Sequence, residues 1–70
     1  MPDFGQSLGA AIAIGLAAIG TAWAQSRIGS AGAGTIAENP DLVGPVIILE
    51  AIPETMVILG FVVAAMILML

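Results

Sequence analysis

The sequence contains no cysteine and no histidine, and Arg27 is its one basic residue. Without cysteine or histidine, neither disulfides nor a zinc site can stabilise a chain of 70 residues, although domains of this size usually need such help. The formal net charge is −4 and there is no basic patch, so nothing would neutralise the phosphates of a nucleic acid. Nucleic acid is therefore excluded as a partner.

Charged residues of either sign are also scarce. They make up 9% of the chain, whereas hydrophobic residues make up 60%. A water-soluble surface needs roughly 25–35% charged residues, so we expect a lipid bilayer to solvate the chain. The start of the chain carries Asp3 rather than basic residues, and the first apolar run is longer than that of a signal peptide. We therefore expect the first apolar segment to remain in the mature protein.

Two long apolar segments flank one polar tetrapeptide. We predict a first helix over about residues 4–37, a polar loop over 38–41 and a second helix over about 45–70. Each helix is long enough to cross a bilayer core, which needs about 20 residues. A loop this short makes the two helices antiparallel neighbours. The predicted fold is an all-α membrane protein, a single transmembrane hairpin over residues 1–70.

The loop consists of Glu38, Asn39, Pro40 and Asp41. Pro40 cannot continue the first helix, and it disfavours helical backbone at Asn39. Pro45 suits the first turn of the second helix, where a missing N–H costs nothing.

Small residues recur every four positions in the first segment, at Gly5, Gly9, Ala13 and Ala17. Such spacing lets helices approach closely in lipid. Two interpretations stay open: the small residues pack against the second helix of the same chain, or they line a tight inner ring of many copies. Because two helices bury little of each other, we expect identical subunits to assemble around the hairpin.

Glu54 lies about ten residues into the second predicted helix, near bilayer depth. A charged side chain there costs about 2.5–3.5 kcal/mol, so the carboxyl group must be protonated, paired or bound to a cation. If the helices pair about the centre of the loop, Gln25 is level with Glu54, and Thr21 lies one turn further along the same face. With Thr55, these residues offer hard oxygen donors suited to H+ or a small cation.

Pro53 is expected to kink the second helix and to free backbone oxygens beside Glu54, or else only to shape helix packing. Glu50 lies one turn before Glu54, and Arg27 lies at a depth between the two. An Arg27–Glu50 ion pair would neutralise both groups; otherwise Arg27 extends to the membrane interface. We take Glu54 as the ion-carrying group and Glu50 as its tuner or a structural partner. The alternative is that Glu54 only joins helices by hydrogen bonding.

Residues 53–64 resemble the second-helix signature of rotary ATPase proteolipids, the c subunits of rotor rings, in which an essential Glu is followed six residues later by Gly. Residues 15–20 and 24–29 resemble the first helix of that family. The short distance from loop to carboxylate is similar to the archaeal and vacuolar-type (A/V-type) branch. Residues 49–53 are similar to an F-type pattern in which the acid precedes Ala-Ile-Pro, so Glu50 is the alternative carrier.

The resemblance implies a homo-oligomeric ring that turns in the membrane against a stator subunit. Residues 38–41 would touch the central-stalk subunits. Glu54 would carry an ion around the ring and couple ion flow to ATP synthesis or hydrolysis in a separate head, so the hairpin would be no enzyme and would hold no cofactor. The resemblance also implies a multi-pass protein, in a prokaryotic plasma membrane, with its loop on the cytoplasmic side.

The resemblance also bears on the choice of ion. In sodium-binding members the ligands would match Glu54 and Gln25, with Thr55 and the carbonyl group of Ile52 from a neighbouring hairpin. The position of a further ligand, commonly Gln, is occupied by Met56 here, which removes a hard oxygen donor. We therefore predict H+ as the transported ion and keep Na+ at Glu54 and Gln25 as the alternative.

Two other functions compete with the rotor subunit. One is a small pore-forming, holin-like hairpin, and the other is an assembly subunit that transports nothing. The common depth of Glu54 and Gln25 and the lack of a basic tail argue against the holin-like hairpin.

Overall fold

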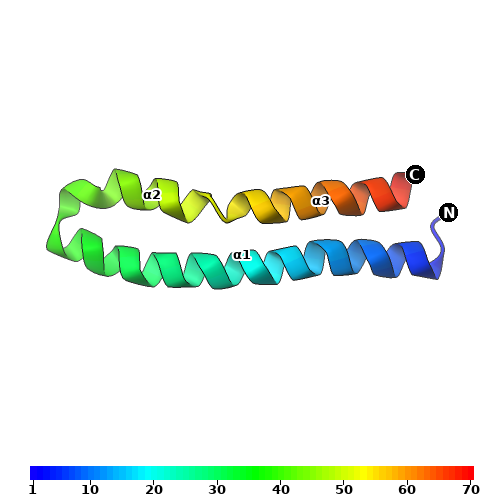
Figure 1. Ribbon diagram of the computed structural model, residues 1–70, viewed down its shortest axis with the longest axis horizontal. Helices are drawn as coiled ribbons and strands as arrows, with labels where there is room; N and C mark the ends of the chain where they lie inside the picture. The colour runs from blue at the N-terminus through cyan, green and yellow to red at the C-terminus, as the bar shows by residue number, and fades with distance from the viewer.

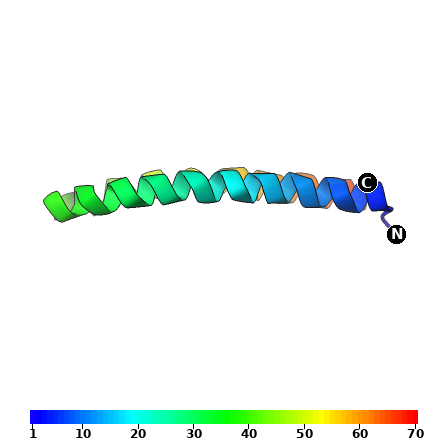
Figure 2. The same cartoon turned by 90° about the horizontal axis from the view of Figure 1, so that it is seen from below.

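The computed structural model describes all 70 residues as two antiparallel arms that form a rod of 53 × 15 × 10 Å (Figure 1). The first arm is one helix, α1, Phe4–Glu38. The second arm consists of a short 3₁₀ helix, η1, Pro40–Leu42, followed by α2, Val43–Ala51, and α3, Glu54–Met69. In the view turned by 90° about the long axis, one arm lies in front of the other (Figure 2). Both termini lie at the end opposite the corner. The predicted two-helix hairpin is confirmed.

The first turn of α1 is fixed by a capping box. The Asp3 carboxylate accepts a hydrogen bond from the Gln6 backbone N–H at 2.7 Å, and the Asp3 N–H donates to the Gln6 side chain at 3.0 Å. The Gln6 amide nitrogen also donates to the carbonyl group of Ile67 at 3.4 Å. One side chain thus both starts α1 and joins it to the end of α3.

The corner is tighter than the predicted loop over residues 38–41. Asn39 has an extended backbone, with φ −143° and ψ 94°, and its N–H donates to the Thr35 carbonyl at 2.9 Å. Its side-chain oxygen accepts from the Asp41 N–H at 3.2 Å. Pro40 starts the 3₁₀ helix at once, because its fixed φ suits a first helical position, so the second arm becomes helical before residue 45.

The second arm is interrupted at Ile52 and Pro53, so the predicted helix over 45–70 is not continuous. Pro53 has no N–H, and its ring clashes with the carbonyl group one turn earlier. The backbone tightens in response: the Thr55 N–H donates to the Ile52 carbonyl at 3.1 Å, and the Met56 N–H donates to the Pro53 carbonyl at 3.0 Å. These three-residue spacings leave other carbonyl groups near the break open to side-chain donors.

Small residues bring the two arms together at two points. At Gly60, an added Cβ would lie 2.6 Å from the Cβ of Ala17 and 3.2 Å from the carbonyl oxygen of Ala13. At Gly32, an added Cβ would overlap with Val46. Ala17 is buried within the hairpin, so this part of the small-residue pattern serves packing inside one chain.

Most of the molecule has no cover of its own. Only seven of 70 residues are buried, and large apolar side chains are exposed along both arms. By length and composition, Phe4–Glu38 and Pro40–Met69 could each cross a membrane. An apolar surface of this extent needs lipid or other subunits against it.

Candidate functional site

Gln25 and Glu54 meet across the two arms near the middle of the rod. The Gln25 amide nitrogen donates to the Glu54 carboxylate at 3.0 Å and to the backbone carbonyl of Glu50 at 3.3 Å. Glu54 is the first residue of α3, directly after the interruption, and its side chain is exposed, whereas Gln25 is half-buried. Gln25 and Glu54, which the sequence places at the same depth, are therefore in direct contact.

The interruption supplies the second feature of the site. The Thr21 hydroxyl donates to the carbonyl group of Pro53 at 2.9 Å, and Thr21 is 4% exposed. The sequence predicts Thr21 as an ion ligand, but its hydroxyl is bonded to the backbone rather than to Glu54. The sequence signal for this contact is a Thr one turn from Gln25, on the face of α1 that meets the proline-containing turn.

Thr55 and Ile52 form a separate part of the site. The Thr55 hydroxyl donates to the carbonyl group of Ile52 at 2.8 Å, and both residues are exposed. Successive helical residues point about 100° apart, so Thr55 does not follow Glu54 toward Gln25. One hairpin thus presents Gln25 with Glu54, and on another side of the second arm it presents Ile52 with Thr55.

Glu50 and Arg27 lie apart in the hairpin, and the predicted pair between them is not made within one chain. A Glu50 carboxylate oxygen lies 2.9 Å from the position of a Cβ added to Gly29. The Arg27 guanidinium lies over the ring of Trp23, 5.4 Å from its centroid. Residues two apart in a helix differ by about 200° in direction, so Arg27 and Gly29 point to opposite sides of α1. Within the hairpin, the ring of Trp23 is thus the partner of Arg27.

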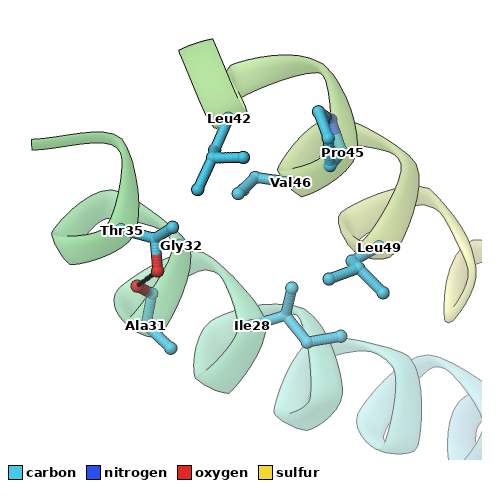
Figure 3. Close-up of a pocket in the computed structure, with 8 residues that line it drawn as sticks. All are labelled: Ile28, Ala31, Gly32, Thr35, Leu42, Pro45, Val46 and Leu49. Carbon is cyan, nitrogen blue, oxygen red and sulfur yellow. Dashed lines mark hydrogen bonds between the residues drawn. The ribbon is translucent and has the colours of Figure 1, made fainter. Parts of the chain in front are cut away.

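An apolar groove lies between the arms near the corner (Figure 3). It is lined by Ile28, Ala31, Gly32, Thr35, Leu42, Pro45, Val46 and Leu49. Its one side-chain hydroxyl, on Thr35, donates to the carbonyl group of Ala31 at 3.1 Å. The groove offers aliphatic contacts and no ionisable group, so the polar chemistry of the chain is concentrated at Gln25 and Glu54.

Comparison with known proteins gives two findings. The family model for the C subunit of ATP synthase matches residues 8–67, which include both arms and the corner. The A-type ATP synthase subunit K of Methanocaldococcus jannaschii is 39% identical over 62 residues, which are 89% of this chain and 28% of that protein. The chain therefore spans little more than a quarter of the length of this relative.

Fold and comparisons agree. The match to the family extends over most of the chain, and the relative is of the A type, which is the branch expected from the sequence. The structure is the expected all-helical hairpin with two apolar arms. The match over most of the chain shows that it belongs to the family of ATP synthase C subunits.

Proposed function

We propose that this hairpin carries an ion on the carboxyl group of Glu54 around the rotor ring of an A/V-type ATP synthase or ATPase, and thereby couples ion flow to ATP synthesis or hydrolysis. The observation that carries the proposal is the hydrogen bond of 3.0 Å from Gln25 to Glu54 at the middle of an apolar rod. A charged side chain at mid-membrane costs about 2.5–3.5 kcal/mol. Acidic residues are therefore rare at that depth, and those that occur usually have a function such as ion transport.

Gln25 can serve both states of the carrier. Its amide NH₂ donates to the ionised Glu54 carboxylate, and its amide oxygen can accept a hydrogen bond from the protonated carboxyl group. Glu54 itself is exposed at the side of the hairpin, where it is accessible to a group on the stator. The carboxyl group travels neutral in contact with lipid, and it ionises only where water or a positive stator group stabilises the charge.

A proton is the ion that the donor set favours. Within one hairpin Glu54 has a single side-chain partner, Gln25, and one partner suffices for a protonated carboxyl group. The sulfur of Met56 lies 3.1 Å from the position of a Cβ added to Gly20, so this side chain packs against α1 and supplies no hard oxygen. Na+ is the alternative, with Gln25 and Glu54 of one copy joined by Thr55 and the Ile52 carbonyl of the next.

The remaining parts of the proposed assembly follow from the family resemblance. Identical hairpins and lipid cover its apolar sides, and a stator membrane subunit meets the ring at the depth of Glu54. Residues 38–41 contact the central-stalk subunits on the cytoplasmic side of a prokaryotic plasma membrane. The acidic side chains of Glu38 and Asp41 are exposed at the corner, which suits a contact outside the bilayer. No contact in the hairpin favours a holin-like pore.

The test is labelling of the detergent-solubilised oligomer with a hydrophobic carbodiimide, which reacts with protonated carboxyl groups in apolar sites. Labelled residues are mapped by mass spectrometry over a pH series, with and without Na+. We expect selective labelling of Glu54 that falls as pH rises and does not respond to Na+. Glu50→Gln should keep the label on Glu54, and Glu54→Gln should lose both the label and coupled ATP synthesis.

The other outcomes are distinct. Protection by Na+ at fixed pH would replace the proton by Na+ and keep the rotor. Labelling of Glu50 alone would make Glu50 the carrier. Coupled ATP synthesis that persists in Glu54→Gln would refute an ion-carrying role and support the assembly subunit.

A further inference from the structure

The charged side chains at mid-depth divide between two sides of the hairpin. Gln25 contacts Glu54, and Gly29, one turn away on the same face of α1, contacts Glu50. Arg27 lies between Gln25 and Gly29 in sequence and points about 200° away from each. The hairpin therefore has a carboxylate flank, formed by Gln25, Gly29, Glu50 and Glu54, and an arginine flank on the opposite side.

A second contact places the arginine flank independently. Gly20 precedes Arg27 by seven residues, which is close to two full turns, so the two residues share one side of α1. Gly20 contacts the sulfur of Met56, whereas the carboxylate groups of α2 and α3 lie against Gln25 and Gly29. Arg27 thus lies on the side of Met56 and away from Glu50 and Glu54.

Each flank leaves one charged group without an ionic partner. The Glu50 carboxylate is half-buried beside Gly29 and makes no hydrogen bond in the hairpin, because the one bond at this residue goes to its backbone carbonyl. The Arg27 guanidinium has only the ring of Trp23. Unpaired charges are costly at membrane depth, so a partner from outside the hairpin would stabilise the charged group on each side.

The two unpaired groups lie at matching depth. Arg27 is about 3 Å along the helix axis from both Gln25 and Gly29, which are the contacts of Glu54 and Glu50. In a closed ring of identical subunits the interfaces are heterologous, so one flank of each copy faces the opposite flank of the next. The arginine flank of one hairpin would then meet the carboxylate flank of its neighbour at this depth.

We propose that Arg27 of each hairpin forms an ion pair with Glu50 of the neighbouring copy, an inference that rests on the ring of the proposed function. Glu50 is the acceptor because its carboxylate has no hydrogen-bond donor, whereas Glu54 already accepts from Gln25. The pair neutralises both charges at each interface between copies. It also holds Glu50 in its ionised form and leaves Glu54 as the group that exchanges the ion.

Disulfide cross-linking tests the pair directly, because the chain has no native cysteine. The double variant Arg27→Cys with Glu50→Cys, oxidised in the membrane, should give a ladder of covalent multimers on a denaturing gel. Either single variant should give dimers at most. A matched control joins Glu50→Cys to Leu16→Cys, which lies on the arginine flank but about 16 Å further along the axis, and should give no ladder.

Charge exchange tests the same pair in variants that keep the electrostatics. Arg27→Glu should reduce coupled ATP synthesis at least tenfold, and the double variant Arg27→Glu with Glu50→Arg should recover most of it. A discrete oligomer that forms without a ladder, a disulfide within single chains, or an exchange variant no better than Arg27→Glu would overturn the pair and leave the rotor intact. Absence of any discrete oligomer from the unchanged protein would instead refute the proposed function.

Discussion

The hydroxyl of Thr21 is bonded to the backbone next to Glu54, the proposed ion carrier. It donates to the Pro53 carbonyl at 2.9 Å from a position with 4% exposure, and Glu54 follows Pro53 directly. The same carbonyl also accepts from the Met56 N–H at 3.0 Å, so the Thr21 hydroxyl is a second donor that joins α1 to this turn. Thr21 is therefore a positioning residue, which acts on Glu54 through the backbone without touching it.

Thr21→Val keeps the shape of the side chain but removes the donor. We expect it to slow carbodiimide labelling of Glu54 and coupled ATP synthesis several-fold, because the Pro53 turn shifts relative to Gln25. Thr21→Ser retains the hydroxyl and should restore both rates. Equal labelling rates in the Val and Ser variants would show that the hydroxyl has no part in positioning the carboxyl group.

The two arms differ as elements. Helix α1 is unbroken over 35 residues, whereas the second arm is divided at Ile52 and Pro53. At the break, the backbone carbonyl groups of Pro53 and Glu50 accept hydrogen bonds from the side chains of Thr21 and Gln25. On the termini side of the break, the arms close on Gly60, where no side chain separates them.

Gly60→Ala should weaken the packing of α3 on α1. The new methyl group would lie 2.6 Å from the Cβ of Ala17 and 3.2 Å from the carbonyl oxygen of Ala13, and neither atom can move without its helix. Overpacking of this kind costs about 1–3 kcal/mol. We expect a lower temperature midpoint for dissociation of the detergent-solubilised oligomer.

Gly44→Ala is the matched control, because nothing lies within 4 Å of the position of its Cβ in the hairpin. It should leave the midpoint unchanged or raise it, since Ala stabilises a helix by about 1 kcal/mol over Gly. If both variants behaved alike, close approach at Gly60 would have no role in stability.

As a whole, the molecule is an apolar rod with polar ends. Its length of 53 Å exceeds the bilayer core of about 30 Å, so the ends project into the headgroup region or beyond. Asp3 lies at the end that holds both termini, and Glu38 and Asp41 lie at the corner. The rod therefore has an acidic corner on one side of the membrane and its termini on the other.

Single cysteines in the cysteine-free chain test this arrangement. With a membrane-impermeant maleimide, Asp41→Cys should react in inverted membrane vesicles and Pro2→Cys in intact cells, because the corner is proposed to face the cytoplasm. Both positions are exposed in the hairpin. The opposite pattern would reverse the orientation, and reaction of both cysteines from one side would contradict a hairpin with two spans.

The sequence by itself determined the spans, the corner and the depth at which Gln25 meets Glu54. Helical rise is constant, and a short corner makes two helices antiparallel, so the depth of a residue can be counted from the corner. Polar residues are so few in these apolar segments that each one marks a possible site. The family resemblance, carried by the same residues, led to the same branch as the comparisons.

Only the tertiary structure decided which way the side chains point. Thr21 binds the Pro53 carbonyl rather than the carboxyl group, and Arg27 lies over Trp23 rather than beside Glu50. The depth of a residue follows from its position along the helix axis. The direction of its side chain depends on how far each helix is rotated about its own axis relative to the other. That rotation is set by close packing at small residues such as Gly60 and by the hydrogen bonds of Thr21 and Gln25 to carbonyl groups at the proline break.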